Sequence, residues 1–320
     1  MAGNAPGTWW SRHYRAVIYG VLALVVLAPT FLNISLKLNI SPSTKGVFDY
    51  IDAIPARRAA YILAVATNLA AVRAATPGDT AAIARVEQHL ARLRRHTNGV
   101  LMLDFNFSPD VSAELEPMAE AVVRHAFERG VSILGTSYSL GSPMAKAILD
   151  RSAQEPRRRY APKHNFAEYV FLGYRPGNVI MQMGQDIISA YGTEYGGKAL
   201  QEIPFMQGVK NYNDIDYVLE ITGFVGQPEY MITVINNKFQ RPLGLGVTAV
   251  SAGDFYPYMQ SRQITGLLVG LRGAAEYEIG LRQPAAAVKM MVTQLFTHLL
   301  AVALIVAGNI EFVWRKFHRA

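Results

Sequence analysis

Two long apolar stretches lie near the two ends of the chain, and each predicts a membrane-spanning helix. Residues 17–36 carry no charged side chain, and a helix of about 20 residues is roughly 30 Å long, which matches the thickness of a bilayer core. Residues 290–314 form the second stretch and place the second span at residues 288–313. The pattern therefore predicts two spans separated by a long domain.

The first stretch has a competing interpretation, a cleaved signal peptide. Such a peptide has a shorter apolar region and ends at a cleavage site of the small-x-small type. Residues 17–36 are too long for that pattern, and no A-x-A triplet follows them. An uncleaved anchor is therefore the favoured interpretation, and Pro29 is compatible with it because membrane helices tolerate a proline kink.

A third apolar stretch, residues 263–281 (QITGLLVGLRGAAEYEIGL), is not predicted to cross the membrane. Only nine residues separate Arg262 from Arg272, and nine helical residues cover roughly 14 Å. We expect a helix of the domain instead, with small residues along one stripe. The stripe consists of Gly266, Gly270 and Ala274. It fits either a tight contact with the domain's own sheet or a groove for a partner helix.

Between the spans, the pattern of residues divides the chain into two parts. Residues 37–98 are rich in Ala and Arg and predict helices, with TPGD as the break between two of them. The end of this segment is typical of a solvated last helical turn, in which basic side chains interact well with the helix dipole. Its residues are Arg92, Arg94, Arg95 and His96. Residues 99–287 follow as a separate domain.

In that domain, buried-type strands alternate with helical segments. The five predicted strands are residues 99–107, 131–139, 169–174, 214–222 and 243–251. Alternation of this kind predicts a mostly parallel sheet with helices on both faces. The expected fold class is therefore α/β, with a Rossmann-like, doubly wound sheet.

The net charge of the chain is concentrated at its ends. Of the total of +7, two charges come from residues 1–16, three from residues 289–320, and two from the 272 residues between them. Basic residues beside a span favour the cytoplasmic side of a membrane. We therefore expect residues 1–16 and 314–320 in the cytoplasm and the domain outside it, in the periplasm or at the cell surface. This distribution favours a lipid bilayer, and not a nucleic acid, as the partner of the basic residues.

The carboxyl ends of the predicted strands are where ligands bind in sheets of this type. Asp104, Ser137 and Asp254 are the candidate site residues there. Asp104 with Asp110 has the chemistry to hold a hard cation or to act as acid and base. Residues 108–110, Ser-Pro-Asp, are also typical of a helix start, and this structural interpretation of Asp110 is the favoured one.

Motifs for cofactors and metals are missing from the sequence. The chain has no cysteine, which excludes disulfides and thiolate zinc sites. The turn after the first predicted strand lacks the G-x-G-x-x-G pattern, and neither a phosphate-binding loop nor H-E-x-x-H occurs. We therefore predict no cofactor and no metal. Whether the protein is an enzyme stays open, and the missing motifs favour a non-enzyme.

Polar side chains in the second span indicate a protein partner. Gln294 and His298 lie one helical turn apart, and polar groups at membrane depth normally bind another helix. Tyr256 and Tyr258 add an aromatic patch that is typical of a contact surface. The expected partners are other membrane-protein subunits or a second copy of the chain. A haem or metal ligand is the alternative for His298, and it rests on one histidine.

Two sequences, YVFLGYRPG and SRQITGLLVGLRGAAEYE, resemble those of a family of uncharacterised prokaryotic membrane-anchored α/β proteins. The resemblance covers roughly residues 99–313, and GAAEYE is its most specific part. It implies an N-terminal anchor, an external α/β domain and a C-terminal span. It implies no activity and no catalytic residue, and residues 56–98 look like an addition to this protein.

The functional expectation follows from the spans and from the missing motifs. We expect a two-pass membrane protein that serves as a structural or assembly subunit, a scaffold within a larger membrane complex. The alternative is a membrane-tethered hydrolase or ligand-binding sensor whose site is at the carboxyl ends of the strands. The two functions predict different results for Asp104→Ala. The change abolishes activity if the protein is an enzyme, and it has almost no effect if the protein is a structural subunit.

Overall fold

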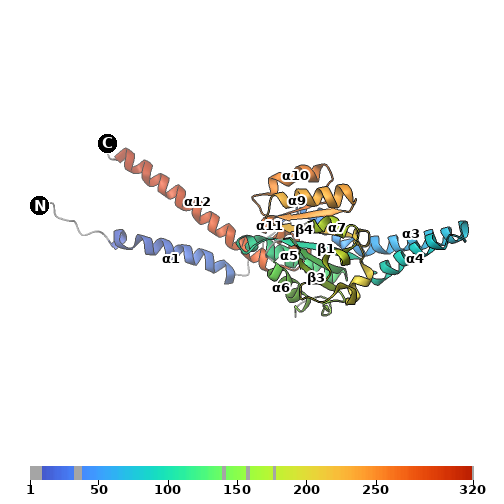
Figure 1. Cartoon of the computed structure of the whole chain (residues 1–320). Helices are drawn as coiled ribbons and strands as arrows, with labels where there is room; N and C mark the ends of the chain where they lie inside the picture. The colour runs from blue at the N-terminus through green and yellow to red at the C-terminus, as the bar shows by residue number, and fades with distance from the viewer. Residues whose placement is uncertain (1–8, 32–37, 139–141, 156–158, 176–177, 319–320) are drawn as a thin grey trace.

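The computed structural model describes residues 9–31, 38–138, 142–155, 159–175 and 178–318. An α/β domain lies at the centre, two long helices leave it on one side, and a helical hairpin projects on the opposite side (Figure 1). The long helices are α1 (Trp9–Phe31) and α12 (Ala286–His318). The hairpin consists of α3 (Ile54–Ala75) and α4 (Thr80–Arg95).

The domain is built on six parallel strands in the order β3-β2-β1-β4-β5-β6. Their bounds are β1 (Val100–Asn106), β2 (Ser132–Ser137), β3 (Tyr169–Tyr174), β4 (Tyr217–Thr222), β5 (Leu243–Val247) and β6 (Leu267–Val269). The predicted α/β class and parallel Rossmann-like sheet are confirmed. The chain moves outward from β1 to β3, returns to β4 beside β1, and then moves outward again, which is a doubly wound path.

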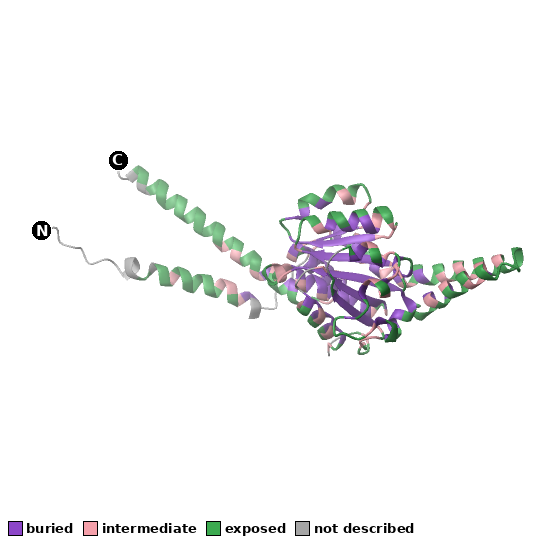
Figure 2. Ribbon diagram, in the orientation of Figure 1, coloured by how far each residue is buried: buried purple, intermediate pink, exposed green. Residues whose placement is uncertain are grey.

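Helices cover both faces of this sheet, which explains why its strands are almost continuously buried (Figure 2). One face packs against α2 (Pro42–Asp52), α5 (Ser112–Glu128), α6 (Ser142–Ala153) and α11 (Gly270–Gly280). The other packs against α7 (Val179–Met183), α8 (Ile187–Tyr191), α9 (Gly226–Met231) and α10 (Ala252–Gln260). The short segments η2 (Leu200–Glu202), η3 (Pro204–Gly208), η4 (Tyr212–Asp214) and η5 (Ile232–Lys238) also pack on this second face. The segment η1 (Pro109–Val111) packs on the first face.

The prediction of one helix over residues 263–281 is wrong in its first half. The chain forms the short strand β6 there, and α11 begins only at Gly270. A Cβ at Gly266 would lie 2.6 Å from both the Ser43 carbonyl oxygen and the Val47 amide nitrogen of α2. The small residues therefore bring α2 against the edge strand, and they do not form a stripe on one helix.

The α3–α4 hairpin is fixed to the domain by a buried arginine. The Arg58 guanidinium donates to the carbonyl oxygens of Leu93, His96 and Asp214. It also pairs with the Asp216 carboxylate at 3.2 Å. The expected solvated end of α4 is wrong for His96, which is buried between the Ser132 hydroxyl and a backbone carbonyl.

Among the described residues, one helical segment is long and apolar enough to cross a membrane, Ala286–Trp314 of α12. The apolar part of α1, Arg15–Pro29, is shorter. Residues 32–36 of the predicted first span lie outside the described residues. Two spans and a cytoplasmic position for both termini therefore stay predictions. The helix α1 packs against α12.

Candidate functional site

The carboxyl edge of the sheet faces the side from which α12 leaves the domain. Ala249, just after β5, and Val269, the last residue of β6, line a cavity together with residues of α12. The α3–α4 hairpin lies at the other edge, because β1 begins directly after it (Figure 1). The strand order reverses between β1 and β4, and the carboxyl ends at such a reversal form the usual ligand crevice of this fold.

Two acidic side chains occupy that reversal point. Asp104 of β1 and Glu220 of β4 are partners in the strand register, and both are fully buried. The Thr136 hydroxyl donates to Asp104 Oδ1 at 3.0 Å, and the Asn106 amide donates to Glu220 Oε1 at 3.4 Å. Asp104 Oδ2 and Glu220 Oε2 have no hydrogen-bond partner among the described residues. The sheet thus holds an acid pair with two unused oxygens.

Burial disfavours ionisation of the acid pair. Burial raises the pKa of Asp104 to about 7, against a smaller lowering by the Thr136 hydroxyl. Burial and the neighbouring Asp104 charge raise the pKa of Glu220 well above its ordinary value. A buried carboxylate lacks hydration, and a second negative charge beside it adds repulsion. The buried site therefore disfavours the doubly ionised state of the pair.

Tyrosine side chains surround the acid pair. Burial raises the pKa of Tyr191 and of Tyr212, and the Asp104 charge contributes to both shifts, so both phenols are neutral. The Tyr212 hydroxyl donates to the Ile180 carbonyl oxygen at 2.7 Å. The Tyr191 hydroxyl is buried without a hydrogen-bond partner among the described residues. The acid pair is therefore enclosed by buried polar and aromatic side chains.

This arrangement has the chemistry of proton exchange. The pKa values of both carboxyls are raised, and two carboxyls that share a buried site can hold a proton between them. The unused oxygens of Asp104 and Glu220 are suited to a ligand that donates hydrogen bonds. No group of three or more His, Asp or Glu side chains with the arrangement of a metal site occurs in the described part of the chain.

The structure places the three predicted site residues apart from one another. Asp104 is at the reversal point, but its neighbour on β2 is Thr136, because side chains alternate between the two faces of a strand and Ser137 belongs to the other face. Asp254 is exposed in the first turn of α10. The sequence interpretation missed Glu220, although an acid inside the apolar run YVLEIT was a usable signal.

A second candidate site is an apolar cavity of about 760 Å³ between the domain and the long helices. Its walls come from α1, the start of α5, the ends of β5 and β6, and α12. Gln294 and His298 both line it, as residues on one face of α12. Neither makes a hydrogen bond with a described residue. Thr293 and Thr297, in contrast, donate to carbonyl oxygens of their own helix.

The other predicted contact residues have mixed positions. Tyr256 is exposed on α10, whereas Tyr258 is half-buried against the core. Ala274 is fully buried. Gly270 has a φ of +51°, and the Glu114 carboxylate and Ala249 fill the space around it. Gly270 and Ala274 therefore contact the domain itself.

Comparison with known proteins gives no family for this chain. No family model matches it, and neither a curated protein nor a solved structure does. The resemblance carried by YVFLGYRPG and GAAEYE accordingly stays a prediction.

Proposed function

We propose that this protein is a two-pass membrane protein that acts as a subunit of a larger membrane complex. Both termini would be cytoplasmic and the α/β domain extracytoplasmic, as the basic residues at the chain ends favour. The observation that carries the proposal is the pair Gln294 and His298. Both line the cavity of about 760 Å³ between the domain and the long helices, which we call the junction cavity, and neither has a hydrogen-bond partner in the described structure.

The surface of α12 supports a lipid environment for this helix. Its exposed apolar side chains include Leu299, Val302, Ile305, Ile310 and Phe312. Each large apolar side chain removed from water contributes about 1.5–3 kcal/mol. A monomer in water would leave this whole surface uncovered, so a bilayer is the environment that fits it.

Within a bilayer, the two polar side chains call for a partner. An amide and an imidazole in hydrocarbon without hydrogen bonds are unfavourable, and they normally face another helix. The packing of α1 against α12 leaves both groups unsatisfied. We propose that a membrane helix of a partner subunit occupies the junction cavity and binds Gln294 and His298.

The test is co-purification after mild-detergent extraction of the native membrane. Gln294→Leu and His298→Leu should release partner proteins, while the tagged chain stays in the membrane fraction. Thr297→Val is a matched control, because the Thr297 hydroxyl is satisfied within the helix. Full retention of partners in both leucine variants, or elution of the wild-type chain alone, would contradict the proposal.

A second function is favoured by the acid pair. The unused oxygens of Asp104 and Glu220 lie at the reversal point of the sheet, where this fold binds ligands. We therefore keep a ligand-binding sensor or a membrane-tethered enzyme as the second candidate. Asp104→Asn and Glu220→Gln should then abolish ligand response or turnover while partner co-purification is unchanged. The subunit proposal predicts that both variants are silent.

A further inference from the structure

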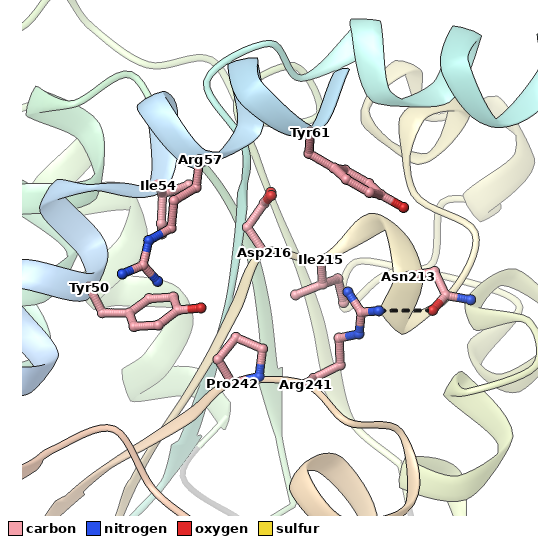
Figure 3. A pocket seen from close by; sticks show the side chains of 9 residues that line it. All are labelled: Tyr50, Ile54, Arg57, Tyr61, Asn213, Ile215, Asp216, Arg241 and Pro242. Carbon is pink, nitrogen blue, oxygen red and sulfur yellow. Dashed lines mark hydrogen bonds between the residues drawn. The ribbon is translucent and has the colours of Figure 1, made fainter. Parts of the chain in front are cut away.

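A second, smaller cavity of about 220 Å³ lies at the amino ends of β4 and β5, beneath the first turns of α3 (Figure 3). Arg57 and Tyr50 form one side of it, and Arg241 rises from the other, with the Asp216 carboxyl between them (Figure 3). Tyr61 closes the side nearest the hairpin. Two arginines, two tyrosines and one acid therefore line the cavity.

The acid in this cavity is already compensated. Asp216 pairs with Arg58 at 3.2 Å and accepts a hydrogen bond from the Val100 amide at 2.7 Å. Neither Arg57 nor Arg241 forms an ion pair with a described acid. Arg58 is the ion-pair partner of Asp216, and the charge of Arg241 also acts to lower the pKa of that carboxyl. The cavity lining thus holds two arginines, Arg57 and Arg241, beside one acid that already has an ion-pair partner.

Arg57 and Arg241 are both held in place, and both have N–H donors that bind no described residue. The Arg57 guanidinium lies over the Tyr50 ring at 3.9 Å, and Tyr50 in turn stacks on Tyr217. Arg241 Nη2 donates to Asn213 Oδ1 at 3.2 Å. Arg241 Nε is buried and has no hydrogen-bond partner in the described part of the chain. A buried donor of this kind is unfavourable unless something accepts from it.

We propose that this cavity binds a small phosphate-bearing anion between Arg57 and Arg241. Guanidinium forks match the oxygens of a phosphate, and two of them on opposite walls neutralise a dianion. The tyrosine rings, with Ile54, Ile215 and Pro242, give the rest of the cavity apolar walls. A phosphate monoester with a small aromatic or aliphatic group fits this combination of charge, size and lining.

The position of the cavity favours a soluble phosphate over a lipid headgroup as the ligand. The cavity lies at the hairpin edge of the sheet, and α12 leaves from the carboxyl edge (Figure 1). Strands rise about 3.3 Å per residue, which places roughly 20 Å of sheet between this cavity and the membrane side. The ligand we assign is therefore soluble. The conclusion that the ligand is soluble rests on the proposed membrane position of α12, whereas anion binding by Arg57 and Arg241 does not depend on the proposed subunit role.

The experiment is a calorimetric titration of the full chain in nanodiscs of neutral lipid at low salt. Phenyl phosphate and inorganic phosphate are the probes, and phenyl phosphate is expected to bind more tightly. Arg57→Gln and Arg241→Gln should each weaken binding about tenfold or more. Arg85→Gln removes an exposed charge from α4 and is the matched control. Thermal unfolding of each variant separates lost binding from lost folding.

Three results would overturn the assignment. The first is no saturable binding of either phosphate by the folded wild-type chain. The second is equal affinity in the two glutamine variants and the control. The third is competition between phenyl phosphate and an anionic lipid added to the nanodisc, because that result would make the cavity a headgroup site.

Discussion

Arg58 of α3 and Asp216, immediately before β4, form an ion pair of 3.2 Å in which the arginine is almost fully buried. The pair connects the hairpin to the amino edge of the sheet. The Arg58 guanidinium also satisfies the carbonyl oxygens of Leu93 and His96. One side chain therefore closes the end of α4 and neutralises an acid of the sheet.

Removal of this arginine is expected to destabilise the domain strongly. Arg58→Met removes the charge that pairs with the Asp216 carboxylate and the guanidinium donors to three carbonyl oxygens, and breaking a buried pair on one side costs about 3–5 kcal/mol. Chemical denaturation of the purified chain measures the change in the free energy of unfolding. Arg85→Met is the matched control, because Arg85 is exposed on α4. Equal stability of the two variants would mean that the pair contributes nothing.

Ionisation of the acid pair should make the folded state less stable as the pH rises. Burial raises the pKa of Asp104 from 3.8 to about 7, so the folded chain binds more protons than the unfolded chain between these values. Stability is then highest near the unfolded pKa and falls up to about pH 7, by about 1.4 kcal/mol for each unit of pKa difference. Asp104→Asn should flatten this fall. A parallel pH profile in wild type and variant would contradict the assignment.

His125 should produce the opposite dependence. Burial lowers its pKa from 6.5 to about 4, despite the raising effect of Asp52. The unfolded chain therefore binds the extra proton between these values, and stability rises with pH through this window and is lost as pH falls. His125→Gln should remove the rise. Denaturation midpoints at pH 4.5 and 6.5 for both proteins measure it, and an unchanged difference between the two pH values would exclude His125 as its source.

A methyl group at the contact between α2 and β6 should be poorly tolerated. The Cβ of Gly266→Ala would lie 2.6 Å from backbone atoms of Ser43 and Val47, which cannot move independently. Overpacking of this kind costs about 1–3 kcal/mol. Gly253→Ala is the control, because nothing lies within 4 Å of its Cβ position. A melting temperature that falls for Gly266→Ala and not for Gly253→Ala is the expected result, and two equal shifts would contradict it.

The periodicity of the chain predicts the sheet well and its edge poorly. Strands such as β1 and β4 are long apolar runs whose environment on both faces is the same, so composition alone identifies them. β6 has only three residues and runs directly into α11, and a pattern that short is also compatible with a helix. Its place in the sheet is decided by α2, which lies more than 200 residues earlier in the chain.

The candidate site was half predictable for a related reason. Asp104 follows from the rule that ligands bind at the carboxyl ends of strands. The choice between Thr136 and Ser137 depends on which face each occupies, and a shift of one residue reverses it. Glu220 becomes the partner of Asp104 only through the register between β1 and β4, two strands more than 100 residues apart in sequence.

The α3–α4 hairpin projects from the domain on the side opposite α12 (Figure 1). The 22 residues of α3 form a helix roughly 33 Å long, whose first turns pack against the amino edge of the sheet. Under the proposed topology, the turn between α3 and α4 is therefore the part of the domain most distant from the membrane. Gly78 in that turn has open space around it, so an epitope tag inserted there would be reachable by antibody from one side of the membrane only. Antibody staining of intact cells is expected if the domain is extracytoplasmic, whereas staining only after permeabilisation would place the domain in the cytoplasm.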